Sequence, residues 1–538
     1  MALWSLKGKK ILIIDDFAEM RSTLRNMLIP FSAEDITVAS NGEDAIELIN
    51  ENRYDIILCD YNLGDGKDGQ QILEEAKLRG KLPYASVFIM VTAESTSFMV
   101  MGALEHQPDD YLSKPFTRNV LQSRIEKLLN KKSSLVKLST ALEQENYALA
   151  IQLCDEAIIS TPTYRTELLR IKTDMLISEQ QLDAACSICD EIIAERNLPW
   201  ARLSRGRIYF LQKDYDSAKT LFESIISDNP AYVSAYDWLA KTQLKLGDTA
   251  TAQKTIEEAV GQSGKSINRQ RMLAEISEAN KDYTTAEKAR RKSIKNSKNS
   301  ILRDASDYTK LAEALSKNDN PKEAFKAIEV AKLDFKDDEQ AQIAVALARS
   351  HVYQDMGQEN EALAAIEEAS TLLQNTKVPI KNELAIELTE SFLAHGKTEA
   401  ADAIVKQLVS NNHDNQELLD KVSQVYTDSD SNQSADELVD GVRKEIIATN
   451  NKGVKLLESG NIDDAIALFE QALQNGPNNQ ALNMNSAQAY LMRMKAQGKN
   501  GSLLERTRNC LDKISDNPDL QKRYKMLNAA YWKTFNKK

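Results

Sequence analysis

The apolar and polar positions of this chain follow two different patterns. Between positions 1 and 130, short apolar runs alternate with amphipathic stretches of helical spacing. The apolar runs predict strands at residues 11–15, 36–39, 54–60, 86–93 and 110–113. Because strands and helices alternate strictly, we expect an α/β doubly wound fold, in which a five-stranded parallel sheet is covered by helices on both faces.

Chemically active side chains stand where the predicted strands end. Asp15 and Asp16 close the first strand, Asp60 closes the third, Thr92 lies near the end of the fourth, and Lys114 follows the fifth. In an open parallel sheet the ligand site lies at the carboxyl ends of the strands. We therefore expect these five side chains to share one site.

The residue types indicate what this site does. Clustered carboxylates repel each other unless a cation neutralises them, and Mg²⁺ prefers oxygen ligands. A carboxylate can also act as a nucleophile toward a phosphoryl group and form an acyl phosphate. A hydroxyl and a lysine facing the metal would bind the remaining phosphoryl oxygens. This combination predicts a phosphorylation site that uses Mg²⁺ or Mn²⁺.

Residues 8 to 130 resemble the receiver (CheY-like) domain of two-component response regulators. The resemblance implies that Asp60 is the phosphoacceptor and that Thr92 and Lys114 bind the phosphoryl group. It also implies that the metal is held by carboxylates and by one backbone carbonyl: Asp15, Asp16, Asp60 and the carbonyl of Asn62.

Three further roles come from the same resemblance. Pro115 matches a cis-proline, and Tyr111 matches a switch aromatic that turns inward when Thr92 moves. Asn62 and Glu94 match positions that tune the rate of autodephosphorylation.

One departure from the family lies in the loop after the phosphoacceptor. Gly64 stands where the family usually has proline, and the matching glycine, Gly69, comes one residue later than usual. The loop is therefore longer and richer in glycine, which predicts altered rigidity around an intact acidic site.

The rest of the chain is built from an internal repeat. Alanines recur at a constant interval, and small residues stand twelve positions before three of them. The interval and the residue choice resemble tetratricopeptide (TPR) repeats, whose period is about 34 residues. The resemblance implies an all-α superhelical solenoid. We expect a receiver at 1–130, TPR-like repeats at 131–445, and C-terminal repeats with a capping helix at 446–538. The alanines are Ala150, Ala184, Ala218, Ala252 and Ala286, and the small residues are Gly206, Ala240 and Ala274.

The middle repeats depart from the strict period. Around Ala324, Ala362 and Ala401 the intervals grow by four or five positions, and the stretch 425–440 is polar and poorly matched. This irregularity predicts longer helices or a break in the superhelix there.

Composition and charge limit the classes of molecule that this chain is expected to bind. The net charge is −12 and no long basic stripe appears, so nucleic-acid binding is disfavoured. No apolar run approaches the roughly 20 residues that span a bilayer, and the N-terminus lacks the features of a secretory signal, so we expect a cytoplasmic protein without membrane insertion. The five scattered cysteines argue against a disulfide framework, and Cys186 and Cys189 fit helical packing better than metal binding.

These patterns favour a phosphorelay response regulator that is not an enzyme, with a protein-binding output in place of DNA binding. A histidine kinase or a phosphotransfer protein would phosphorylate Asp60. The surface of the fourth and fifth receiver helices, in segments that contain Phe98, Met99, Val120 and Leu121, would then act on the TPR array and its unknown protein partner, or on a second receiver in a homodimer. The alternative is a phosphate sink, or a constitutive TPR scaffold that regulates a kinase or another response regulator.

Overall fold

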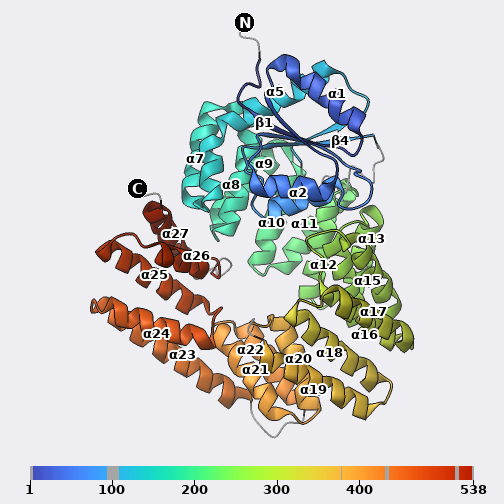
Figure 1. The fold of residues 1–538 in the computed structure, drawn as a ribbon, viewed down its shortest axis with the longest axis vertical. Coiled ribbons are helices and arrows are strands. Elements are labelled where there is room, and N and C mark those ends of the chain that lie inside the picture. Colours follow the sequence, from blue (N-terminus) through green and yellow to red (C-terminus); the bar gives the residue numbers. More distant parts are fainter. Residues whose placement is uncertain (1–3, 94–107, 377–378, 430–434, 515–519, 536–538) are drawn as a thin grey trace. The chain divides into compact units, whose positions relative to one another are not determined.

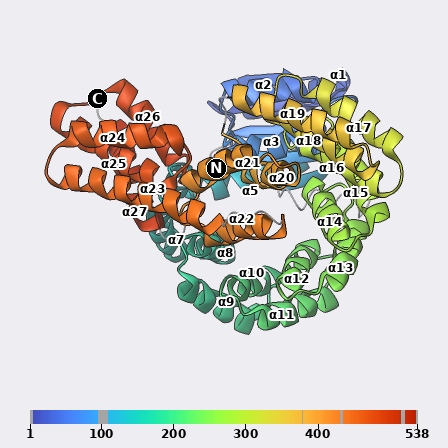
Figure 2. The same cartoon turned by 90° about the horizontal axis from the view of Figure 1, so that it is seen from below.

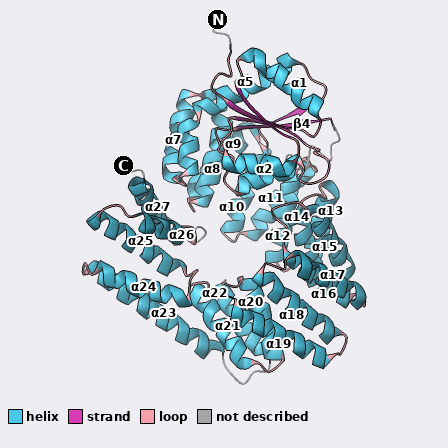
Figure 3. Cartoon of the chain, in the orientation of Figure 1, coloured by secondary structure: helices cyan, strands magenta, loops and turns pink. Residues whose placement is uncertain are grey.

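The computed structural model describes residues 4–93, 108–376, 379–429, 435–514 and 520–535 (Figure 1). The chain forms two compact units, Met1–Asp304 and Ala305–Lys538. The first unit contains the sheet and the first helical repeats, and the second is built from helices (Figure 3).

The sheet at the N-terminus is parallel throughout. Its strands are β1 (Lys10–Ile14), β2 (Asp35–Ala39), β3 (Ile56–Asp60), β4 (Val87–Thr92) and β5 (Asp110–Ser113), in the order β2-β1-β3-β4-β5. Each neighbouring pair runs in the same direction. The predicted doubly wound sheet is confirmed, and the carboxyl ends of β1, β3 and β4 meet at one edge.

Helices cover both faces of the sheet. Helices α1 (Ala18–Leu28) and α5 (Arg118–Ser134) pack on one face through Leu24, Leu28, Leu121 and Ile125. Helices α2 (Gly42–Glu51) and α3 (Gly69–Leu78) pack on the other face. The short 3₁₀ helix η1 (Ile29–Phe31) follows α1.

The fourth receiver helix predicted from the sequence, with Phe98 and Met99, lies outside the described residues. On α5, Val120 is exposed, but Leu121 is buried in the core. Of these two residues in the predicted segment, only Val120 is therefore placed to contribute to a surface of α5. The reason is helical geometry, because neighbouring residues of a helix face different directions.

Paired helices continue from the sheet to the end of the first unit, and in Figure 2 α9 to α15 follow one another along an arc. Antiparallel neighbours bury their apolar faces against each other and against the next pair. The elements are α6 (Val136–Glu143), α7 (Tyr147–Ser160), η2 (Pro162–Tyr164), α8 (Arg165–Ser178), α9 (Leu182–Arg196), α10 (Pro199–Leu211), α11 (Tyr215–Asp228), α12 (Val233–Lys245), α13 (Thr249–Gln262), α14 (Ile267–Ala279) and α15 (Tyr283–Ser297).

The second unit repeats this arrangement with several longer helices. The helix α23, which begins in the polar stretch at 425–440, has 24 residues, so the prediction of a longer helix there is confirmed. The elements are α16 (Ala305–Lys317), α17 (Pro321–Asp334), α18 (Glu339–Asp355), α19 (Glu359–Asn375), α20 (Asn382–Ala394), α21 (Thr398–Asn411), α22 (Gln416–Asp428), α23 (Ala435–Glu458), α24 (Ile462–Asn475), α25 (Gln480–Gln497), α26 (Gly501–Leu511) and α27 (Gln521–Phe535). Across the described residues, no helix combines the length and the apolar character that crossing a bilayer requires.

A left-handed residue marks the turn inside each of many repeats. Its positive φ angle lets the chain reverse between the two helices of a pair. The turns are almost evenly spaced as far as Lys281, and from Asp319 onward the spacing is longer by four or five positions, which confirms the drift predicted from the alanines. The residues are Glu145, Gln180, Lys213, Gly247, Lys281, Asp319, Gly357 and Gly396.

Small residues let the two helices of a pair approach closely. Gly206 faces Phe222, and a Cβ atom on Gly206 would lie 2.4 Å from the phenyl ring. One alanine of the series differs from the others, because Ala184 is exposed and the neighbouring Ala185 is fully buried. The turn at Gln180 explains this shift, because it comes one position later than an even spacing between Glu145 and Lys213 would place it.

The cysteine pair behaves as helical packing. Cys189 is buried in an apolar cluster with Ala185 and Ile208, and burial raises the pKa of its thiol to about 12. Cys186 donates a hydrogen bond to Asp190. Among the described residues, the group with metal-binding geometry contains neither cysteine.

Two glycines of the same helix provide a matched test of the packing. On α23, a Cβ atom at Gly453 would lie 2.3 Å from the ring of Phe469, whereas Gly441 has open space around it. We expect Gly453→Ala to destabilise the protein by about 1–3 kcal/mol through overpacking. Gly441→Ala should stabilise it by about 0.5–1 kcal/mol through helix propensity. Thermal unfolding of both variants checks this, and equal shifts would contradict the assigned packing.

Candidate functional site

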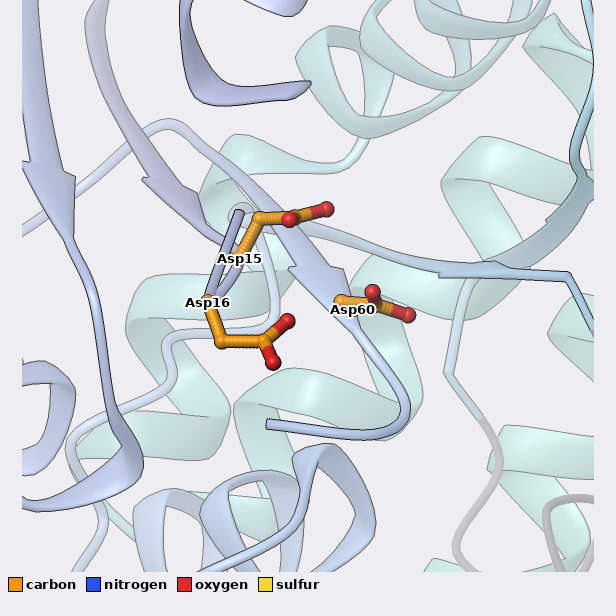
Figure 4. Close-up of side chains that lie close together, drawn as sticks. All are labelled: Asp15, Asp16 and Asp60. Atoms are coloured by element: carbon orange, nitrogen blue, oxygen red, sulfur yellow. The ribbon is translucent and has the colours of Figure 1, made fainter. Parts of the chain in front are cut away.

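Three carboxylates meet at the carboxyl edge of the sheet. Asp15 and Asp16 follow β1, and Asp60 is the last residue of β3, which lies beside β1 (Figure 4). Each side chain offers an oxygen atom within 4.8 Å of the others. Asp15 is fully buried and Asp60 is 8% exposed, so the negative charges face each other with little water between them.

Lys114 neutralises part of this charge. Its Nζ atom lies 2.8 Å from Asp15 Oδ2 and 2.8 Å from Asp60 Oδ2, so one ammonium group bridges two carboxylates. Lys114 follows β5, and its backbone N–H donates to the carbonyl of Thr92 at the end of β4. The peptide bond between Lys114 and Pro115 is cis.

Burial and charge act in opposite directions on these groups. Burial raises the pKa of Asp60 above its usual value, and the hydrogen bond from Lys114 opposes this rise. Burial by itself lowers the pKa of Lys114, but its hydrogen bonds to Asp15 and Asp60 outweigh burial and leave that pKa raised. The lysine therefore stays charged and favours the ionised form of Asp60.

Hydrogen bonds hold Asp15 and Asp16, the acidic loop that directly follows β1. Asp15 Oδ1 accepts a hydrogen bond from the backbone N–H of Phe17. The Arg21 guanidinium donates to the carbonyls of Asp15 and Asp16, at 2.6 and 3.0 Å. These bonds leave the carboxylate of Asp16 available to a further ligand.

The oxygen atoms present fit a hard divalent cation. Asp16 Oδ1 is buried and has no hydrogen-bond partner among the described residues, which is costly for a carboxylate unless a cation binds it. The donor set of three carboxylates matches the ligands of Mg²⁺. Asp15, Asp16 and Asp60 would hold such an ion.

The glycine at the start of α3 is required by the backbone of Asp60. A Cβ atom on Gly69 would lie 2.2 Å from the carbonyl oxygen of Asp60, and the Gly69 N–H donates to the carbonyl of Tyr61. Gly64 and Gly66 both have positive φ angles, 75° and 106°. The longer loop predicted from the sequence thus turns twice through conformations that favour glycine before it returns to the site.

Three of the remaining predicted residues belong to the described part of the chain. Thr92 ends β4, and Asn62 is exposed in the loop, where its side-chain oxygen accepts from the N–H of Gly64. Tyr111 lies on β5, and its buried hydroxyl has no hydrogen-bond partner among the described residues. Glu94 lies outside the described residues.

Two residues at the site were not predicted. Arg21 fixes the acidic loop, but an arginine in the first turns of an amphipathic helix carries no signal that separates it from a solvated one. Tyr61 directly follows Asp60 and is 5% exposed. Its position next to Asp60 was the available signal, but Lys265, which donates to its hydroxyl, lies 204 residues further along the chain.

Two family models match parts of the chain. The response regulator receiver domain matches residues 11–126, and a tetratricopeptide repeat model matches residues 209–289 and 456–494. These ranges cover the sheet and two stretches of the paired helices.

Curated relatives match the same N-terminal region. The chemotaxis protein CheY of Pseudomonas aeruginosa is 31% identical over 122 residues, which are 23% of this chain and 97% of that protein. The chemotaxis protein CheY-3 of Vibrio cholerae is 28% identical over 125 residues, which are 23% of this chain and 95% of that protein. A solved structure, the receiver domain of the Francisella response regulator 1452, is 27% identical, with a TM-score of 0.21 and coverage of 23% of this chain and 98% of that one.

The geometry predicts that Mg²⁺ binds and that the three carboxylates hold it. Asp16→Asn should weaken Mg²⁺ binding by about tenfold or more, because it removes a charged ligand. The matched control is Glu47→Gln, which removes one negative charge from an exposed position on α2. Isothermal titration of the full chain with MgCl₂ measures both variants. Equal affinity of Asp16→Asn and native protein would contradict the assigned site.

Proposed function

We propose that Asp60, in the response regulator receiver domain at residues 11–126, accepts a phosphoryl group that controls what the helical repeats bind. The observation that carries the proposal is the buried cluster of Asp15, Asp16 and Asp60 bridged by Lys114. A histidine kinase or a phosphotransfer protein is the proposed donor.

The reaction transfers a phosphoryl group from a histidine nitrogen to a carboxylate oxygen. An oxygen of the Asp60 carboxylate attacks the phosphorus of a phosphohistidine, the P–N bond breaks with its electron pair on the imidazole nitrogen, and an acyl phosphate forms. Mg²⁺, when bound at the carboxylates, neutralises charge on the transferred group. Lys114 favours the ionised form of Asp60 and supplies a cation for a phosphoryl oxygen.

We assign the output to protein binding. The repeat region is made of stacked helix pairs, an architecture that presents extended surfaces. Among the described residues, the one group with metal-binding geometry is that of Asp15, Asp16 and Asp60. We place the protein in the cytoplasm, where such donors and partners are found.

The direct test is phosphate incorporation by the full chain. With phosphoramidate and Mg²⁺, native protein should gain one acid-labile phosphate, and Asp60→Asn should gain none because the amide cannot form an acyl phosphate. The matched control is Asp65→Asn, an exposed acid on the same loop, which should react like native protein. Phosphate-affinity electrophoresis and intact mass spectrometry measure the product. Equal incorporation into Asp60→Asn would refute the assignment.

A further inference from the structure

The loop that follows Asp60 is attached to the helical repeats of the same compact unit. The name "loop–repeat contact" is used for the bonds between two segments. The first segment is residues 61–74, the loop and the start of α3. The second is residues 265–300, from just before α14 to just beyond α15. Both segments lie within Met1–Asp304. This surface differs from the fourth- and fifth-helix surface expected from the sequence.

A reciprocal pair of hydrogen bonds forms the centre of the contact. Lys67 Nζ donates to the carbonyl of Asn299 at 2.6 Å, and Asn299 Nδ2 donates to the carbonyl of Gly66 at 2.6 Å. Lys67 also forms an ion pair with Glu75, whose side chain is 4% exposed. The loop is therefore fixed to α3 and to the repeats by the same lysine.

Two further bonds extend the contact along α3. Gln71 Nε2 donates to the carbonyl of Asn296 at 3.2 Å, and Ser300 Oγ donates to Glu74 Oε2 at 3.2 Å. Asn296 in turn donates to the carbonyls of Gly264 and Lys265, so the loop before α14 is tied to the end of α15. The contact thus reaches a whole helix pair.

Tyr61 connects the contact to the phosphoacceptor. It is the next residue after Asp60, its N–H donates to the carbonyl of Val91 on β4, and its hydroxyl donates to Gln70. Lys265 Nζ donates to the same hydroxyl at 2.9 Å and lies 5.0 Å from the centre of the ring. The repeats therefore hold a side chain that is one peptide bond from Asp60.

Tyr111 lies close to this connection. Burial raises the pKa of Tyr111, and the neighbouring hydroxyl of Tyr61 adds to the rise. The Tyr111 hydroxyl has no hydrogen-bond partner among the described residues, so a hydroxyl that needs a partner lies near the one that Lys265 uses. Tyr111 packs against the apolar core cluster that contains Tyr61, which connects β5 with the residue that Lys265 binds.

The long loop makes the contact possible and leaves it room to change. The positive φ of Gly66 allows the turn that places its carbonyl against Asn299. A cavity of about 480 Å³ lies beside the contact, lined among others by Asn62, Gly64, Asn268 and Lys298. Open space therefore borders the loop on the side of the repeats.

We propose that the loop–repeat contact is an intramolecular latch that holds the α14–α15 pair against the unphosphorylated receiver and is released by phosphorylation of Asp60. The inference rests on the proposed function and adds the route by which the phosphoryl group reaches the repeats. A phosphoryl group brings additional negative charge and three strong acceptor oxygens to the carboxyl edge of the sheet. The loop must re-form around it, and the bonds of Gly66, Lys67 and Gln71 fit the present loop conformation.

Hydrogen exchange of the full chain tests the release. Native protein with phosphoramidate and Mg²⁺ should exchange about fivefold faster in the backbone amides of 264–270 and 296–301 than without the donor, because the bonds that restrict local opening are lost. Asp60→Asn should not respond. Phosphate on Asp60 is measured in the same samples. Absence of phosphate refutes the proposed function, whereas full phosphorylation with unchanged exchange in both segments refutes the latch alone.

Substitutions in the repeats test the same hydrogen bonds, with exchange measured in the loop. Lys265→Met keeps the length of the side chain but removes the bond to Tyr61, and Asn299→Ala removes the bond to Gly66. Both should speed exchange in residues 61–71 about threefold without any donor, and by linkage both should be phosphorylated more readily. Lys292→Met, at an exposed position on α15, is the control and should match native protein. Native-like exchange in both test variants, or equal acceleration in the control, would overturn the latch.

Discussion

The concentration of negative charge at the carboxyl edge of the sheet is the constraint on which the rest of the structure depends. Two carboxylates within 4.8 Å of each other repel by about 3–4 kcal/mol at an effective dielectric constant near 20, and three are present. Lys114 offsets part of this cost by bridging Asp15 and Asp60. The buried oxygen of Asp16, which has no hydrogen-bond partner in the described part of the chain, leaves the remaining charge to a cation or to a phosphoryl group bound together with one. The site is therefore arranged so that its electrostatic balance changes when Asp60 is modified.

A change in this electrostatic balance affects the helical repeats, because the loop after Asp60 is bonded both to the sheet domain and to the repeats of the first unit. Gly69 allows α3 to begin directly against the Asp60 carbonyl, and Tyr61 and Lys67 carry bonds to residues more than 200 positions away. The repeats themselves are held by contacts between neighbours, such as that of Gly206 with Phe222. Stability in such an array is roughly a sum of local terms, so a bond to one helix pair can alter that pair without unfolding the others.

The sequence predicted those features that arise from local pattern. Apolar runs predicted the strands. The positions of Asp15, Asp16, Asp60 and Lys114 at strand ends predicted a shared site, because parallel strands bring their carboxyl ends together. Period counting indicated the repeats and included Ala184, but the buried residue is Ala185, because the turn at Gln180 comes one position later than an even spacing. The segment with Val120 and Leu121 was expected to present a surface, and the packing of α5 decides that Val120 is exposed and Leu121 faces the core. The bonds of Lys265 and Asn299 to the loop depend on how the repeats curve, and no local pattern encodes that.

The central claim is that the phosphoryl state of Asp60 controls protein binding, and affinity capture in four conditions tests it most directly. Native and Asp60→Asn chains are immobilised, each with and without phosphoramidate and Mg²⁺, and the proteins retained from a lysate of the source cells are quantified by mass spectrometry. We expect at least one protein whose capture by native chain changes about fivefold or more with the donor while its capture by Asp60→Asn stays constant. Capture of the same proteins in equal amounts under all four conditions would contradict the account and favour a constitutive scaffold or a phosphate sink.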